Sequence, residues 1–204
     1  YEDIKEALLS AKEYIFLEFF IVRKGKMLTE ILEIIQAKLK EGVKVYFIYD
    51  NFGGSRDLPF RFKQKIRKMG VKTKTFNRIF PTLNISFNYR DHRKIVVVDG
   101  KIAFTGGINI GDEYINREIR FGYWKDGGIR LKGKGVANFA LIFLNVWETL
   151  TKEHLDPKEF IKNEEASDAE GYVISFQDGP LNYNHIIHGV YLTMINTAQK
   201  YIYI

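Results

Sequence analysis

Residues 94–105 read KIVVVDGKIAFT, which is two short apolar runs joined by Asp99 and Gly100. Apolar runs joined by Asp-Gly are the strongest short-range signal for a β-hairpin, because both residues tolerate the left-handed backbone of a tight turn. We therefore predict two antiparallel strands over 94–98 and 101–105. The first strand is almost wholly apolar, so it is expected to be buried.

The segments on either side of this hairpin alternate between helical and strand patterns. Apolar residues recur with helical spacing over 4–12, 27–40, 59–69 and 135–150. Aromatic and β-branched residues predominate over 14–22, 43–49 and 71–76, as in strands. The order strand, helix, strand, helix, strand before the hairpin predicts an α/β fold with right-handed crossovers.

Composition limits the class of protein. Of the 204 residues, 46% are hydrophobic and 27% are charged, which is typical of a globular domain and excludes a disordered or fibrous chain. Lys and Arg number 31 against 25 Asp and Glu, and the net charge of +6 indicates an anionic partner, either a nucleic acid or a lipid surface. The absence of cysteine excludes disulfides, thiolate metal ligands and cysteine nucleophiles. No uninterrupted apolar run reaches the roughly 18 residues that a membrane span needs.

Two residues that can carry phosphoryl chemistry stand directly before the buried strand. His92 and Lys94 are two positions apart, so their side chains should project from the same face. An imidazole can attack phosphorus, and an ammonium can neutralise phosphate oxygens. The other histidines make a weaker case: His185 and His188 have no carboxylate or thiolate ligand nearby, His154 lies in an acidic segment, and we predict no metal site.

The second hairpin strand leads into Gly106-Gly107 and then Asn109. Glycines permit close approach of the backbone. Because this strand runs back antiparallel to the first, Asn109 should emerge near His92 and Lys94, where its amide can donate to a phosphate oxygen. These three residues predict a phosphate site that needs no metal. The alternative interpretation is an exposed strand end with two polar side chains.

The spacing His92-x-Lys94-x4-Asp99, followed by two glycines and Asn109, resembles the signature of the phospholipase D superfamily. Nearly the whole chain is similar to bacterial cardiolipin synthases. This closer similarity is carried by EFFI at 18–21, NYRDHRKIVVVDGK at 88–101, NIGDEY at 109–114, FGYWKD at 121–126 and Gly179-Pro180. One departure is Gly127-Gly128, where such synthases usually carry Thr-His.

This resemblance implies a phospholipase D-like mixed β-sheet flanked by helices on both faces. It implies a phosphatidyl transferase that makes cardiolipin from two phosphatidylglycerol molecules, releasing glycerol, through a phosphatidyl-histidine on His92. The implied partners are phosphatidylglycerol, the membrane, and a second His-x-Lys half of the same chain or a homodimer mate that supplies the general acid. No metal or other cofactor and no nucleic acid is expected. The implied location is the bacterial cell membrane, reached through hydrophobic spans before Tyr1.

Two acidic residues need separate treatment. Asp99 belongs to the signature, and the resemblance includes it among the catalytic residues with His92 and Lys94. It lies five residues beyond Lys94, however, or about 16 Å at the rise of a β-strand, so we expect its role to be structural. In the family a downstream carboxylate orients the histidine, and we assign this role to Asp126, with Glu113 and Glu118 as alternatives.

The end of the chain repeats its beginning. Residues 198–204, AQKYIYI, echo 11–17, AKEYIFL, and a helical pattern precedes both copies. We therefore predict a first phospholipase D-like domain over 1–178, with an acidic linker at about 152–170. Residues 179–204 would then be the start of a truncated second domain of the same kind.

Two other functions use the same residues. A phospholipase D-like phosphodiesterase or nuclease would share the motif and use water as the acceptor. A non-catalytic module that binds lipid or nucleic acid is also compatible with a chain that holds one motif. The sequence around His92 and the stretch at 109–114 favour the synthase.

Overall fold

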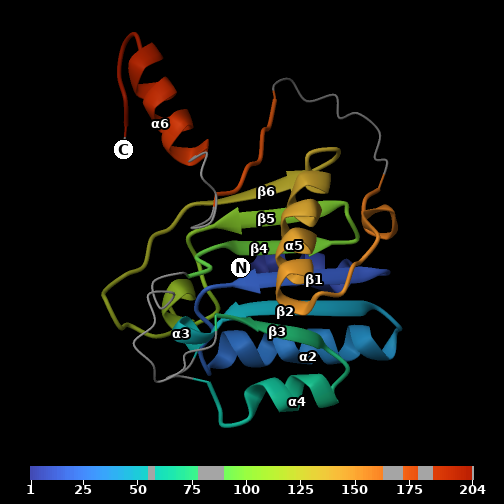
Figure 1. The fold of residues 1–204 in the computed structure, drawn as a ribbon. Coiled ribbons are helices and arrows are strands. Elements are labelled where there is room, and N and C mark those ends of the chain that lie inside the picture. The colour runs from blue at the N-terminus through green and yellow to red at the C-terminus, as the bar shows by residue number, and fades with distance from the viewer. Residues whose placement is uncertain (55–57, 78–89, 163–171, 179–185, 204) are drawn as a thin grey trace, which may run out of the picture. The chain divides into compact units, whose positions relative to one another are not determined.

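The computed structural model describes residues 1–54, 58–77, 90–162, 172–178 and 186–203 (Figure 1). They divide into two compact units, Tyr1–Ala169 and Glu170–Ile204, and each is described by itself. Among the helices of these described residues, none combines the length and the apolar content needed to cross a membrane.

The first unit is built on a six-stranded mixed sheet with the order β3-β2-β1-β4-β5-β6. The strands are β1 Tyr14–Phe19, β2 Lys44–Asp50, β3 Lys72–Phe76, β4 Lys94–Val98, β5 Ile102–Gly106 and β6 Gly128–Lys132. β1, β2 and β3 pair in parallel, and β4 pairs antiparallel with both β1 and β5. The hairpin predicted from the Asp-Gly sequence is confirmed as β4 and β5. β6, which pairs antiparallel with β5, has no counterpart among the predicted strands.

Helices cover both faces of this sheet, as the α/β prediction requires. One face packs against α1 Glu2–Ser10, α2 Lys26–Lys40 and α4 Phe62–Lys68. The other face packs against α5 Val136–Thr151, which lies across the strands in Figure 1. The described part of the unit also contains three short elements: α3 Asn51–Gly54 and the 3₁₀ turns η2 Asp112–Ile115 and η3 Pro157–Glu159.

The central strand β1 is buried along its whole length, so it belongs to both cores. Leu17 and the residues that share its face pack toward α1 and α2. On the opposite face, the ring of Phe16 stacks on that of Phe143 at 4.2 Å between centroids. The hydroxyl of Tyr14 donates to the carbonyl of Phe160 at 2.6 Å, and Phe160 is itself buried. The acidic segment predicted as a linker therefore includes residues that pack on the sheet, and 163–170 lie outside the described residues.

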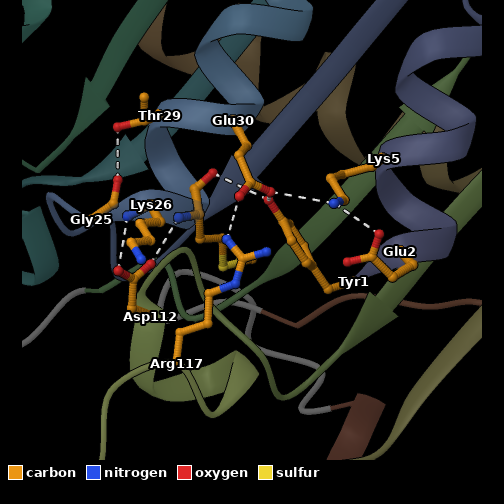
Figure 2. A network of polar contacts seen from close by, with 10 residues as sticks. Tyr1, Glu2, Lys5, Gly25, Lys26, Thr29, Glu30, Asp112 and Arg117 are labelled. Atoms are coloured by element: carbon orange, nitrogen blue, oxygen red, sulfur yellow. Dashed lines mark hydrogen bonds and ion pairs between the residues drawn. The ribbon is translucent and has the colours of Figure 1, made fainter.

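The loop after β5 is fixed to the start of α2. The carboxylate of Asp112 accepts hydrogen bonds from the backbone N–H groups of Lys26 and Met27, each at 2.8 Å (Figure 2). This satisfies two of the N–H groups that a helix N-terminus leaves free and places negative charge where the helix dipole favours it. A Cβ atom on Gly25 would lie 2.7 Å from the Asp112 carboxylate, so only glycine fits there.

A second set of contacts joins α1, α2 and the same loop. Glu30 of α2 forms an ion pair with Arg117, accepts a hydrogen bond from the Tyr1 hydroxyl at 2.9 Å, and lies 3.3 Å from Lys5 Nζ (Figure 2). The hydrogen bond from Arg117 is the main cause that lowers the pKa of Glu30 to about 2, and hydrogen bonds from Tyr1 and Lys5 act in the same direction. These contacts hold the segment 109–117, which follows β5 and begins at Asn109, against the start of α2.

In the second unit, α6 spans Ile186–Thr197. Residues 198–203, which echo the β1 sequence, form no strand in the described part of the chain. The assignment of 179–204 to a second domain stays a prediction. Gly179-Pro180 and His185 lie outside the described residues.

Asp99 lies at the hairpin turn and holds it to the start of β1. Its carboxylate accepts hydrogen bonds from the backbone N–H groups of Lys12, Glu13 and Tyr14 at 2.7, 2.8 and 2.8 Å. The backbone of Asp99 has a φ of 52°, and that of Gly100 a φ of 67°, which is the left-handed pair that a tight hairpin favours. This geometry supports a structural role for Asp99.

We predict that Asp99→Ala lowers the free energy of unfolding by about 2–4 kcal/mol, because it removes a charged acceptor from three N–H groups at once. Asp99→Asn should lose less, since one acceptor oxygen remains. Urea unfolding measures both. Lys101→Ala, an exposed change in the same turn, is the matched control and should stay within about 0.5 kcal/mol of the parent. An Asp99→Ala protein as stable as this control would contradict the assignment.

Candidate active site

His92 and Lys94 meet at the point where β4 begins. Lys94 Nζ lies 3.1 Å from His92 Nδ1 and donates to the His92 carbonyl at 2.5 Å. The ring of Phe20, just beyond β1, lies 4.7 Å from the His92 ring, and Lys94 Nζ lies 5.4 Å from the Phe20 centroid. The two side chains singled out in the sequence are therefore in direct contact beside the end of β1.

Burial changes the protonation of both groups. Burial is the main cause that lowers the pKa of Lys94 to about 8, against the opposing charges of Asp91 and Asp126. Burial and then the charge of Lys94 also lower the pKa of His92 from its ordinary value of 6.5, against Asp91 and Asp50. A neutral imidazole therefore stands beside an ammonium that is close to losing its proton, which is a suitable pair for attack on an anionic phosphodiester.

Asn109 lies in the segment that follows β5 and is almost fully buried. Its Oδ1 accepts a hydrogen bond from the backbone N–H of Ile21 at 2.9 Å. The next residue, Ile110, exchanges backbone hydrogen bonds with Ile21 and Arg23, so the segment is joined to the chain after β1. Phe20, which contacts His92, directly precedes Ile21. Asn109 is thus anchored beside the short segment that borders His92, and a side-chain hydrogen bond also joins it to Tyr114.

Asp126 lies beside Gly107, close enough that a Cβ atom on that glycine would meet its carboxylate at 2.1 Å. Its Oδ2 accepts a hydrogen bond from Trp124 Nε1 at 2.9 Å. Its charge opposes the lowering of the Lys94 pKa, whereas Asp91 and Asp50 are the carboxylates that oppose the lowering of the His92 pKa. A role of Asp126 in orienting His92 stays a prediction. Its contribution in this structure is to Lys94.

The two alternatives to Asp126 have other surroundings. Glu113 is buried and forms an ion pair with Arg23. Glu118 is exposed. Within the described ranges, no group of three or more histidine, aspartate and glutamate side chains is arranged to hold a metal ion.

A buried carboxyl cluster that was not predicted from the sequence includes Asp91, the residue directly before His92. Glu18 on β1 and Asp91 are both buried, and Arg93 Nε lies 2.8 Å from a carboxylate oxygen of each. Burial and the charge of Asp91 hold the pKa of Glu18 well above its ordinary value, and they outweigh the opposing effect of Arg93. A charged residue inside the apolar run YIFLEFF is the signal that could have found this cluster, because a buried charge is expensive unless it has a partner.

A second missed carboxylate, Asp50 at the end of β2, holds the chain just before His92. It is fully buried and accepts backbone hydrogen bonds from Phe52 at 2.7 Å and from Asp91 at 3.0 Å. Arg90 Nη1 lies 3.3 Å from the same carboxylate. The backbone of the residues directly before the motif histidine is therefore fixed from β2, independently of β4.

Glu18→Gln tests the protonation of this cluster. As pH rises above 4.5, the ordinary pKa of the group, the unfolded chain releases the Glu18 proton while the folded protein keeps it, so this group makes stability fall with pH. Glutamine mimics the protonated form and removes that dependence. The melting temperature of Glu18→Gln minus that of the parent should therefore increase between pH 5 and 8.

Glu18→Ala is the companion variant. It leaves Asp91 and Arg93 with an unfilled space in the buried cluster and should cost about 2–4 kcal/mol near pH 5, and this cost should become smaller as pH rises because alanine, like glutamine, does not titrate. A melting-temperature difference for Glu18→Gln that shrinks with rising pH would mean that Glu18 is ionised in the folded protein.

Comparison with known proteins places this geometry in a family. The family model described as "Cardiolipin synthase, PLD-like domain" matches residues 4–120, which is more than half of the chain. A cardiolipin synthase 2 from Bacillus anthracis is 38% identical over 206 residues, covering 100% of this chain and 40% of the relative. The chain thus spans less than half the length of this curated relative.

Solved structures agree on the fold. A phosphatidylserine synthase from Haemophilus influenzae matches with a TM-score of 0.55 and 18% identity, over 78% of this chain and 38% of that one. Nuc from Salmonella typhimurium, a phospholipase D family member, matches with a TM-score of 0.50 and 19% identity, over 72% of this chain and 86% of that one. The sheet, the His92–Lys94 pair and the match over 4–120 lead to one conclusion: the chain belongs to the family of cardiolipin synthase, phospholipase D-like domains.

Proposed function

We propose that this chain carries one half of a phosphatidyl transferase that makes cardiolipin from two phosphatidylglycerol molecules, with His92 as the nucleophile. The observation that carries the proposal is the contact between Lys94 Nζ and His92 Nδ1, at 3.1 Å, beside the buried end of β1. Membership of the cardiolipin synthase family supplies the class of substrate. Because these substrates are lipids, the reaction takes place at a membrane surface.

In the first step a ring nitrogen of His92 attacks phosphorus. The N–P bond forms, the P–O bond to the glycerol headgroup breaks, and glycerol leaves with one proton. In the second step a glycerol hydroxyl of another phosphatidylglycerol attacks the phosphatidyl-histidine, and the N–P bond breaks as the new O–P bond forms. The proton of that hydroxyl restores the acid, so two phosphatidylglycerols give one cardiolipin and one glycerol.

The described residues divide this work between them. Lys94 supplies a positive charge for the phosphate oxygens, and the amide of Asn109 supplies a hydrogen-bond donor. His92 cannot attack phosphorus and also hold the proton for the leaving glycerol. We therefore place the general acid in a second half of the same kind, either later in the same polypeptide or on a homodimer mate.

The contact with Lys94 also bears on which nitrogen of His92 attacks. A ring nitrogen that accepts a hydrogen bond from an ammonium carries no proton, so Nδ1 is the lone-pair nitrogen in this arrangement. When phosphate binds, Lys94 turns its donors to the phosphate oxygens and frees Nδ1. A carboxylate that accepts a hydrogen bond from Nδ1–H would favour the tautomer with the proton on Nδ1, so that Nε2 carries the lone pair and attacks phosphorus. This is the role predicted for Asp126.

We predict that His92→Ala abolishes cardiolipin formation in the whole polypeptide that carries this chain. Lys94→Ala should reduce the rate by about 10²–10³, the usual effect of losing one preorganised charge at a reacting oxyanion. The assay follows labelled phosphatidylglycerol in vesicles and separates cardiolipin from phosphatidic acid. His154→Ala, at an exposed histidine, is the control. Near-normal transfer by His92→Ala would contradict the nucleophile assignment, and phosphatidic acid as the main product would indicate a hydrolase.

A second prediction concerns pH. With the pKa of Lys94 lowered to about 8, its ammonium is lost as pH rises above that value, and kcat/KM should fall there. On the acid side, kcat/KM should fall when His92 gains its proton, at a pH below 6.5. Lys94→Arg keeps its charge at all accessible pH values and should remove the alkaline fall, even where the absolute rate is lower. If the alkaline fall persists in Lys94→Arg, another group controls it.

A further inference from the structure

The face of the sheet that packs against α1 contains a groove that begins at the phosphate site. The groove lies between α1 and the strands β4, β5 and β6, and it has a volume of about 210 Å³. Lys94 lines one end of it. Because side chains two apart on a strand share a face, Val96 continues the floor from Lys94. Phe19, which pairs with Lys94, and Phe104, which pairs with Val96, extend the floor to the neighbouring strands.

The floor of this groove is hydrocarbon. Phe19, Val96 and Phe104 form it and are 3%, 1% and 8% exposed, and Ile4 of α1 and Ile108 form the walls. Such a surface cannot satisfy the hydrogen bonds of a sugar or a headgroup, whose burial there would be costly. Burial of methylene groups against it is favourable, at about 0.8 kcal/mol for each. The chemistry of the groove therefore selects an aliphatic ligand.

The charged side chains that line the groove are Asp3, Lys94 and Arg130. Lys94 is at the end that adjoins His92, and Arg130 of β6 lies 3.7 Å from Asp3 of α1 across the opening. The Arg130 guanidinium also lies 5.9 Å from the centre of the Phe104 ring. A carboxylate on the rim disfavours a nucleic-acid backbone, which needs a continuous basic track. One cation beside the nucleophile and an apolar floor leading away from it match an anionic phospholipid.

We propose that this groove holds an acyl chain of the phosphatidyl group that is transferred, so that the chain lies along Phe19, Val96 and Phe104 while its phosphate lies against Lys94. This inference rests on the proposed transferase function and adds a binding site to it. Binding of the chain places phosphorus beside His92 and contributes to the choice of substrate. Phospholipids with chains too short to reach the floor should gain little from the groove.

Gly128 offers a way to fill the groove. It lines the groove at the start of β6, opposite Gly106. A Cβ atom built there meets only the Thr105 carbonyl oxygen, at an ordinary 3.6 Å. Gly128→Leu can therefore carry a side chain into the groove without a backbone clash. Gly127→Leu is the matched control, because a Cβ at Gly127 meets nothing within 4 Å and this residue does not line the groove.

The experiment compares dioleoyl with dibutyroyl phosphatidylglycerol in the whole polypeptide that carries this chain. Each methylene lost from the groove costs roughly a factor of four. Gly128→Leu should therefore lower kcat/KM for the dioleoyl lipid at least about tenfold and that for the dibutyroyl lipid less than about twofold. Gly127→Leu should leave the ratio of the two substrates unchanged. An equal fall for both substrates in Gly128→Leu, or no fall for either, would overturn the proposal.

Photolabelling of the unaltered protein gives a second test that does not depend on a folded variant or on turnover. Phosphatidylglycerol with a diazirine within its acyl chain should label peptides that contain Ile4 or Phe104, and unlabelled dioleoyl phosphatidylglycerol should compete. Absence of label there, including the case in which another part of the polypeptide fills the groove, would refute the acyl site. If these residues are labelled but the polypeptide forms no cardiolipin, the proposed reaction is wrong and the acyl-chain site still stands.

Discussion

The register between β1 and β4 is the constraint on which the site depends. Lys94 pairs with Phe19, and this places the histidine side of β4 at the end of β1. At the opposite end, the Asp99 carboxylate holds three N–H groups at the start of β1. A shift of one residue in the β1–β4 register would turn Lys94 to the other face of the sheet. It would also move each apolar side chain of β4 to the face opposite the one on which it now packs. The signature aspartate thus positions the site from the far end of the strand.

A fixed register allows the protein to bury charge where reaction needs it. Lys94, Glu18, Asp50 and Asp91 are all buried in the part of the sheet beside His92. Each costs free energy to remove from water, and partners such as Arg93 offset only part of that cost. The surrounding apolar core offsets the remainder. Because Lys94 is buried and its Nζ is held by the His92 carbonyl, its positive charge is already in place for the proposed phosphate.

Sequence patterns predicted the parts of this arrangement that depend on local rules. The Asp-Gly turn, the β4–β5 hairpin and the α/β order follow from turn chemistry and from hydrophobic periodicity. The strand period predicted that His92 and Lys94 share a face, and the two side chains are in contact although β4 begins only at Lys94. Sequence patterns gave no sign of β6, because Gly128–Lys132 is short, largely exposed and lacks the apolar run of a buried strand. β6 forms because the edge of β5 offers backbone hydrogen-bond partners, and not because its own residues have a strand pattern.

The buried carboxyl cluster that includes Asp91 depends on long-range packing, which local patterns do not record. Glu18 comes from β1, Asp50 from β2, and Asp91 precedes β4, so only the strand order β2-β1-β4 brings them together. The groove beside Lys94 has the same origin, since α1, β4 and β6 each supply one side of it. Lys94 borders both features. In the proposed site, Lys94 therefore lies between the position of the phosphate and the apolar floor of the groove, and the ligand that we propose carries an anion next to a hydrocarbon chain.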